Sequence, residues 1–316
     1  MKKIFSCVKE ILSAVADWLY PPRCVACGVL LALNEPARYV CVDCVDLFEV
    51  VTTPFCGRCG APVKTKDDAG ESTEAEGVIP PNAEGWTATG TITTGGAEIK
   101  SCASCMGRIF FFERNIAAFI YDDLMREMLH DMKFRAKKRV ATGLGQVWGA
   151  AVSNNVSMAN VAAANKNVAK CDDLTASKNV AFCDNFICHE NPLRDFILVP
   201  VPMHKKKQRE RGFNQAEIMT LELAKKISVP VSNALVRTFD TPPQSELHPS
   251  QRVENVTGVF ALAKNHDARG KSYILTDDIF TTGASINECA KVLKNAGAER
   301  VLCMTLCITV KKSSEK

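Results

Sequence analysis

The chain has 316 residues, of which 47% are hydrophobic, and its formal net charge is +4. This length allows one to three domains, and the composition is ordinary for a globular protein. The mild charge excludes binding to nucleic acid through a global excess of positive charge, so any such surface must be a local patch.

Residues 1–22 predict an amphipathic helix, because their apolar residues fall on one helical face. Lys9, Glu10 and Asp17 interrupt the apolar run and no small-residue cleavage site follows, so a secretion signal is disfavoured. No stretch is long and apolar enough to span a bilayer. We expect this helix to dock on the protein's own body, with a membrane surface or a partner as the alternative, and we expect a cytoplasmic protein.

Fifteen cysteines are present, and eight of them form four Cys-x-x-Cys pairs. The odd number and the length argue against a disulfide framework. Two intervening residues let one turn of chain present both sulfurs to a tetrahedral ion, and four thiolates close its coordination sphere. A redox pair is the alternative. The pairs combine in chain order into two predicted structural Zn²⁺ sites, Cys24/Cys27/Cys41/Cys44 and Cys56/Cys59/Cys102/Cys105.

Two polar segments interrupt the chain. Residues 64–100 are rich in Gly, Thr, Ala and Glu, and we interpret them as a mobile insertion within the second ribbon. Residues 153–192 are rich in Asn, Ala and Lys and are interpreted as a second insertion. The sequence thus divides into the N-terminal helix, a ribbon region over residues 23–112, and a third region over residues 113–316.

The third region alternates between strand and helix patterns. Strands are predicted at residues 117–121, 196–201, 273–276 and 300–310, and helices at residues 124–134 and 214–226, with a last helix that opens at Ser285 and ends at Gly297. Such alternation implies an α/β fold with a parallel sheet, whose ligands bind at the carboxyl ends of the strands.

The segment YILTDDIFTTGAS begins at Tyr273 and combines a strand, two acids and a loop of small residues. Loop amides and a helix N-terminus direct donors at an anion. The acids Asp277 and Asp278 suit a sugar diol or a bound metal, and a solvated acidic strand end is the alternative. The segment therefore predicts a phosphate-binding loop, made of Thr281, Thr282, Gly283, Ala284 and Ser285.

Two basic segments lie outside this loop. The run from Lys205 to Arg211 follows the buried strand that ends at Pro202, and it suits either contact with an anion or a solvated helix start. The run from Lys133 to Arg139 ends a helix, and its members Arg135, Lys137 and Lys138 are expected to form an exposed face, with a nucleic-acid surface as the alternative. Phe110–Phe112 form the one aromatic cluster apparent in the sequence, so no rich platform for base stacking is predicted.

The segment YILTDDIFTTGAS resembles the phosphoribosyl pyrophosphate (PRPP) motif of type I phosphoribosyltransferases. Together with the four Cys-x-x-Cys pairs, VPVP, RERGFNQA and TPPQS, in this order, the chain resembles the ComF family of competence-associated proteins over nearly its whole length. That resemblance implies a double zinc ribbon followed by a parallel-sheet type I phosphoribosyltransferase fold.

The resemblance also implies roles for individual residues. Asp277 and Asp278 would take the ribose hydroxyls of PRPP, directly or through Mg²⁺, and the loop after them would hold the 5′-phosphate. Pro202 and Met203 would approach the pyrophosphate, with Arg211 nearby. Thr276 and Phe280 depart from the family pattern, and the larger Phe280 is expected to crowd the loop.

Two functions follow from the resemblance. The first is a phosphoribosyltransferase linked to DNA uptake, which displaces pyrophosphate from Mg²⁺–PRPP in favour of an acceptor that the sequence does not identify. The alternative is a non-catalytic competence factor that binds single-stranded DNA or the DNA-uptake machinery and uses the PRPP fold as a scaffold or sensor.

Overall fold

The computed structural model describes residues 21–31, 37–51, 55–63, 92–94, 97–99, 102–135, 137–153, 193–241 and 255–310. The predicted N-terminal helix, most of the first insertion and nearly all of the second lie outside these ranges. Among the residues described, no helix combines the length and the apolar character needed to cross a membrane.

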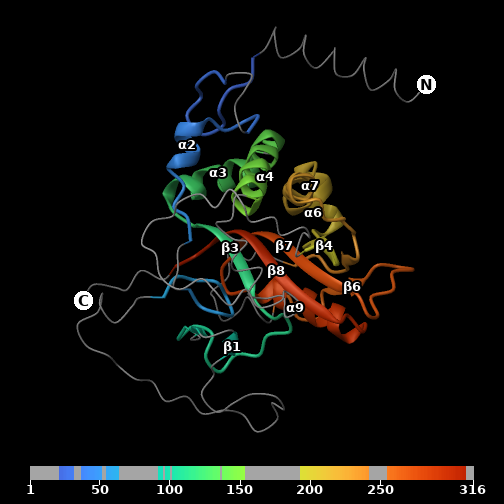
Figure 1. The fold of residues 1–316 in the computed structure, drawn as a ribbon. Coiled ribbons are helices and arrows are strands. Elements are labelled where there is room, and N and C mark those ends of the chain that lie inside the picture. The colour runs from blue at the N-terminus through green and yellow to red at the C-terminus, as the bar shows by residue number, and fades with distance from the viewer. Residues whose placement is uncertain are drawn as a thin grey trace.

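A four-stranded sheet with the strand order β3-β8-β7-β4 organises the fold (Figure 1). The strands are β3 (Asn115–Ile120), β8 (Arg300–Ile308), β7 (Ser272–Phe280) and β4 (Phe196–Pro200). All three pairings are parallel. The strands are nearly continuous apolar runs because helices cover both faces of the sheet. The predicted α/β fold with a parallel sheet is confirmed.

Three helices cover one face of the sheet and one helix covers the other (Figure 1). The first face carries α3 (Asp123–Phe134), α4 (Lys138–Ser153) and α7 (Gln215–Ile227), and the second carries α9 (Ala284–Asn295). Asn214 begins α7 as an N-cap, because its side chain accepts a hydrogen bond from the amide of Ala216 at 3.2 Å.

The remaining elements are short. A one-turn helix, α2 (Val42–Asp46), belongs to the first ribbon, and α6 (Lys205–Arg211) ends at Gly212 in the left-handed conformation. The strands β5 (Leu235–Arg237) and β6 (Phe260–Leu262) form a separate antiparallel pair. Within the predicted polar insertion, β1 (Ile92–Thr94) pairs with β2 (Ala97–Ile99), a hairpin that the composition did not indicate.

Each cysteine ribbon belongs to the core on one face of the sheet. Cys24, Cys41 and Cys44 pack with the buried side chains of α3, α4 and α7. The second core holds Cys56, Cys59 and Cys105 together with the buried side chains of α9. The two ribbons therefore extend opposite faces of one fold.

The strand β7 is longer than predicted. The sequence placed its end at Thr276, but the strand continues through both acids to Phe280. The reason is that β8 continues beside it, with Asp277 opposite Thr305 and Phe280 opposite Ile308. Because consecutive side chains of a strand point to opposite faces, Asp277 and Asp278 start from opposite faces at the carboxyl end of β7.

Candidate functional site

The predicted ligand residues from two strands meet at the carboxyl edge of the sheet. Beyond the end of β4, the amide of Val201 donates to the carbonyl of Thr276 at 2.9 Å, which places Pro202 and Met203 beside the acidic end of β7. The side-chain amide of Asn214 donates to the carbonyl of Val201 at 3.2 Å. The VPVP and RERGFNQA segments thus meet at this edge.

The small-residue loop turns sharply into α9 at Gly283. This residue has a φ of 71° and is the N-cap of α9. A Cβ atom there would overlap the ring of Phe280, which is buried directly beneath it. Glycine is therefore required both by the left-handed backbone and by the space. The amides at the start of α9 remain at the loop, where a helix N-terminus favours an anion.

The two departures from the family pattern are both accommodated. Thr276 is fully buried, and its hydroxyl lies 2.6 Å from the hydroxyl of Thr220 on α7. The ring of Phe280 fills the space under Gly283 and meets the ring of Phe112 edge-on, with the centroids 6.2 Å apart. Phe280 therefore lies beneath the loop and packs against the residue at its turn.

Asp278 faces the α3 side of the sheet and forms an ion pair there. Its Oδ2 atom lies 2.5 Å from the ammonium of Lys133, and its side chain is 5% exposed. Burial lowers the pKa of Lys133, but the charge of Asp278 and its hydrogen bond outweigh this effect, so the net pKa is raised. The sequence placed Lys133 in the basic run that ends this helix and assigned it no partner; the structure turns this lysine inward to pair with a buried carboxylate.

Asp277 faces the α9 side, where Arg237 and Cys289 are its electrostatic neighbours. Burial raises the pKa of Asp277 well above its ordinary value, and the negative charge of Asp278 raises it further. Its carboxylate also accepts a hydrogen bond from the amide of Asp278 at 2.9 Å. An acid that is costly to ionise, at a strand end, marks a candidate binding site.

The basic helix α6 lies next to this edge. Arg211 is half-buried and donates to the side chain of Gln215 at 2.8 Å. Burial lowers the pKa of Arg211, and the negative charge of Asp278 offsets this lowering only in part. Lys206 and Lys207 lie 3.5 Å and 3.8 Å from the carboxylate of Asp240. Of this run, Arg211 is the member that the structure brings into the field of the acids.

Both cysteine clusters have the predicted pairing. In each cluster the four sulfurs lie within 4.8 Å of one another. The separation is 3.7 Å between Cys27 and Cys41 and 3.6 Å between Cys59 and Cys102. A tetrahedral site with Zn–S bonds of about 2.3 Å requires sulfurs about 3.8 Å apart. Both donor sets therefore fit Zn²⁺, and with four sulfurs each would be a closed, structural site.

Each cluster holds at least one thiol whose pKa is lowered; in the second cluster, hydrogen bonds with Cys102 and Cys105 lower the pKa of Cys56 well below its ordinary value. Burial raises the pKa of Cys24, but hydrogen bonds from the backbone at Cys27 and Cys41 outweigh it and lower the pKa to about 7. In the second cluster, the hydrogen bond with Cys105 is the largest cause that lowers the pKa of Cys102 to about 7. Thiolates are the ligand form that Zn²⁺ requires.

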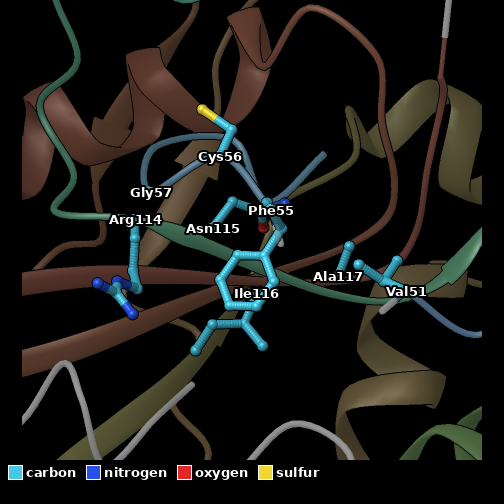
Figure 2. A pocket seen from close by; sticks show the side chains of 9 residues that line it. Val51, Phe55, Cys56, Gly57, Arg114, Asn115, Ile116 and Ala117 are labelled. Carbon is cyan, nitrogen blue, oxygen red and sulfur yellow. The ribbon is translucent and has the colours of Figure 1, made fainter. Parts of the chain in front are cut away.

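The second ribbon packs closely on the first strand of the sheet. Figure 2 shows Phe55, Cys56 and Gly57 beside the start of β3. The amide of Asn115 donates to the carbonyl of Arg58 at 2.8 Å. The cavity between the ribbon and the strand has a volume of 10 Å³, about enough for one water molecule. This contact is therefore structural packing and not a ligand pocket.

The predicted aromatic cluster is not a stacking platform. Phe112 is 2% exposed and Phe110 packs against it, with the ring centroids 5.1 Å apart. Another pair was missed: Phe134 is 65% exposed and its ring lies 4.7 Å from that of His130. The spacing of four residues on a helix is the signal that identifies such a pair.

Two regions of the chain match known protein families. Residues 15–75 match the double zinc ribbon domain, and residues 213–316 match the phosphoribosyl transferase domain. The fold and the clusters therefore define a protein with a double zinc ribbon followed by a phosphoribosyltransferase-type domain.

Two relatives agree with this class, one over most of the chain and the other over about a third of it. The chain is 25% identical over 270 residues to the competence protein ComFC of Bacillus subtilis, which covers 84% of this chain and 82% of that protein. It is 31% identical over 114 residues to the DNA utilization protein YhgH of Escherichia coli, covering 36% of this chain and about half, 49%, of YhgH. The resemblance to the ComF family is confirmed.

A solved structure of phosphoribosylpyrophosphate synthetase from Mycobacterium smegmatis is also similar, at 19% identity and a TM-score of 0.20. The aligned region covers 35% of this chain and 28% of the synthetase chain, and no conclusion rests on this similarity.

Proposed function

We propose that the carboxyl edge of the sheet binds Mg²⁺–PRPP and that the protein acts in DNA uptake or utilisation, as the names of ComFC and YhgH suggest for those relatives. The observation that carries the proposal is the pair Asp277–Asp278, which immediately precedes a loop that turns into a helix N-terminus. Under this proposal, residues 23–112 form the ribbon region and residues 113–316 the phosphoribosyltransferase-like domain.

Each part of PRPP has a chemically matched partner at this edge. The 5′-phosphate would lie against the amides of Thr281–Ser285, where the dipole of α9 favours negative charge. The ribose hydroxyls would donate to Asp277 and Asp278. The pyrophosphate would approach the turn at Pro202 and Met203, within the field of Arg211.

Lys133 supports this arrangement from the α3 side. Its ammonium pairs with Oδ2 of Asp278 and holds this carboxylate in a fixed, buried position. The other oxygen, Oδ1, is then the acceptor for a ribose hydroxyl. Mg²⁺ has a preference for carboxylate and phosphate oxygens and, once bound, would neutralise the charge of the pyrophosphate.

We propose a group transfer as the reaction of this site. The bond between the anomeric carbon and the pyrophosphate oxygen breaks, pyrophosphate leaves with the electron pair, and an acceptor atom bonds to the carbon. Such a step needs stabilisation of charge more than a protein nucleophile. Asp277 and Asp278 would hold the ribose at the reacting carbon while Arg211 would stabilise the leaving group.

Calorimetric titration of PRPP with Mg²⁺ tests the proposal. The wild type is expected to bind, and the double variant Asp277→Asn/Asp278→Asn to lose at least tenfold in affinity, or about 1.4 kcal/mol. The matched control is Asp267→Asn, because Asp267 is an exposed acid before β7 that pairs with Arg269. Absence of binding by the wild type refutes the function, and binding that survives the double substitution refutes the site.

A second candidate function is binding of single-stranded DNA. The observation that favours it is a groove of 420 Å³ between the first ribbon and α3, whose lining includes the basic residues Arg126, His130 and Arg135 and the acids Glu127 and Asp131. The exposed ring of Phe134 lies beside His130, with the ring planes tilted by 35°. Bases stack on exposed aromatic rings, and neighbouring arginines attract the phosphates.

Binding of a labelled oligonucleotide at several salt concentrations tests this candidate. Phe134→Ala is expected to weaken binding by about 1–3 kcal/mol, the usual value of one stacked base. Phe239→Ala is the control, since Phe239 is equally exposed, at 63%, and lies after β5. Equal affinities of the two variants, or binding that is indifferent to salt, would count against a DNA surface here.

A further inference from the structure

The chain leaves the second cysteine cluster and passes directly onto the proposed phosphate loop. Cys105 ends the knuckle, its amide donating to the carbonyl of Cys102 at 2.8 Å. Three residues later, the guanidinium of Arg108 donates to the carbonyl of Thr282 at 2.6 Å. Thr282 is the second residue of the small-residue loop, so one hydrogen bond joins the ribbon to the loop itself.

Arg108 is held in place from two sides. Its guanidinium lies 4.9 Å from the ring centroid of Phe110, a cation–π contact, while Nη2 reaches Thr282. Its own amide donates to the carbonyl of Cys105 at 3.2 Å, which fixes the start of the side chain to the knuckle. A planar, stacked guanidinium is a more rigid link than an ordinary long side chain.

The residues after Arg108 continue the contact along α9. The side chain of Asn287 donates to the carbonyl of Ile109 at 3.1 Å and accepts from the amide of Phe111 at 2.8 Å. The ammonium of Lys291 lies 5.8 Å from the ring centroid of Phe111. The segment 108–111 is thus paired with the first two turns of the helix whose N-terminus faces the proposed phosphate.

The contact also reaches the underside of the loop. Phe112 packs edge-on against Phe280, and Phe280 lies beneath Gly283. The ribbon segment therefore touches the loop from the side, through Arg108, and from below, through Phe112. Among the described contacts, the first ribbon reaches no residue of this loop; it packs on α3 and α4.

We infer that the second zinc ribbon positions the phosphate loop, with Arg108 as the positioning residue, so that affinity for a phosphate monoester depends on a contact outside the phosphoribosyltransferase-like domain. The ligand named here rests on the proposed function, whereas the ordering of the loop does not. A loop whose amides must converge on one anion binds more tightly when it is held in that conformation beforehand.

The test compares Arg108→Gln, Arg108→Lys and the wild type, each as the full chain with Zn²⁺. Two probes separate the parts of the site: ribose 5-phosphate for the phosphate loop, and inorganic pyrophosphate with Mg²⁺ for the turn at Pro202. Arg108→Gln is expected to lower affinity for ribose 5-phosphate about tenfold, the value of one charge-assisted hydrogen bond. Affinity for pyrophosphate should not change, and Arg108→Lys should restore part of the loss.

Hydrogen exchange supplies a readout that needs no ligand. In Arg108→Gln, the amides of residues 281–287 should exchange faster while those of β7 do not. Arg269→Gln is the matched control, since Arg269 is an exposed arginine that pairs with Asp267 before β7, and it should change nothing.

Unchanged exchange in the loop overturns the inference, as does an equal loss of affinity for both probes, which would indicate general unfolding. If the wild type binds neither probe, the proposed function fails, and the exchange experiment still decides whether Arg108 orders the loop.

Discussion

The two cysteine clusters share one ligand spacing and one chemistry, yet they serve different parts of the molecule. The first extends the core under α3 and α4, where Tyr39 and Val40 press against the backbone of α4 at Gly143. The second extends the α9 core, and its exit segment contacts the proposed phosphate loop. A zinc site with four protein ligands has no open coordination position for a substrate, so its role depends on what the residues beside it contact.

Removal of one cysteine ligand from each cluster should have the largest effect and tests whether the two clusters have different roles. Cys44→Ser and Cys105→Ser should each lose one zinc ion per chain and several kcal/mol of stability, because zinc binding at a structural site contributes directly to folding. Elemental analysis and thermal unfolding measure both effects. Faster exchange in residues 281–287 is expected for Cys105→Ser alone; the same change in Cys44→Ser would contradict the separation of roles.

Lys133 connects α3 to the proposed site through its ion pair with Asp278. Lys133→Met should destabilise the fold by about 3 kcal/mol, since it leaves the buried Asp278 carboxylate without its partner. Chemical denaturation measures the loss, and Lys138→Met, at an exposed lysine that begins α4, is the control. Adding Asp278→Asn to Lys133→Met should recover part of the stability; no recovery would mean that the ion pair is not the cause.

Gly283→Ala probes the support of the loop from below. The added methyl group must displace the ring of Phe280 and occupy a left-handed backbone, at a cost of about 1–3 kcal/mol. Gly258→Ala has the same φ of 71° but no neighbour within 4 Å, so it isolates the cost of the backbone alone. Equal melting temperatures for the two variants would show that the ring of Phe280 moves aside without a cost in stability.

The smallest effect is expected at Asp277 and depends on pH. The pKa of Asp277 is raised in the folded protein, so folding favours the protonated acid. This contribution to stability is fully present below the unfolded pKa of about 3.9 and is lost as the pH rises through the folded pKa. Asp277→Asn should therefore raise stability at pH 7 by about 1 kcal/mol, and the gain should shrink as the pH falls towards 4. Melting curves across this range measure it; a gain that is independent of pH would contradict the raised pKa.

Much of the fold could be predicted because its signals are local. The Cys-x-x-Cys spacing gave the correct pairing of both clusters, and the buried apolar runs placed all four strands of the sheet. The helix over residues 214–226 followed from its apolar periodicity, and the loop before α9 followed from its small residues. Each of these features is decided within a few residues of chain.

The rest depends on contacts between distant residues. Lys133 carries the same local pattern as its exposed neighbours, and only the packing of α3 across the end of β7 turns it towards Asp278. The extension of β7 to Phe280 is decided by its neighbour β8. Arg108 lies 174 positions before Thr282, so no spacing rule connects the two. The roles of the predicted ligand residues themselves remain predictions.

The most direct test of the central claim is a crystal structure of the full chain with Zn²⁺, Mg²⁺ and PRPP. The account predicts the 5′-phosphate against the amides of Thr281–Ser285, the ribose hydroxyls on Asp277 and Asp278, and Arg108 still bonded to Thr282. PRPP bound elsewhere, or a loop that holds the phosphate after releasing Arg108, would contradict it.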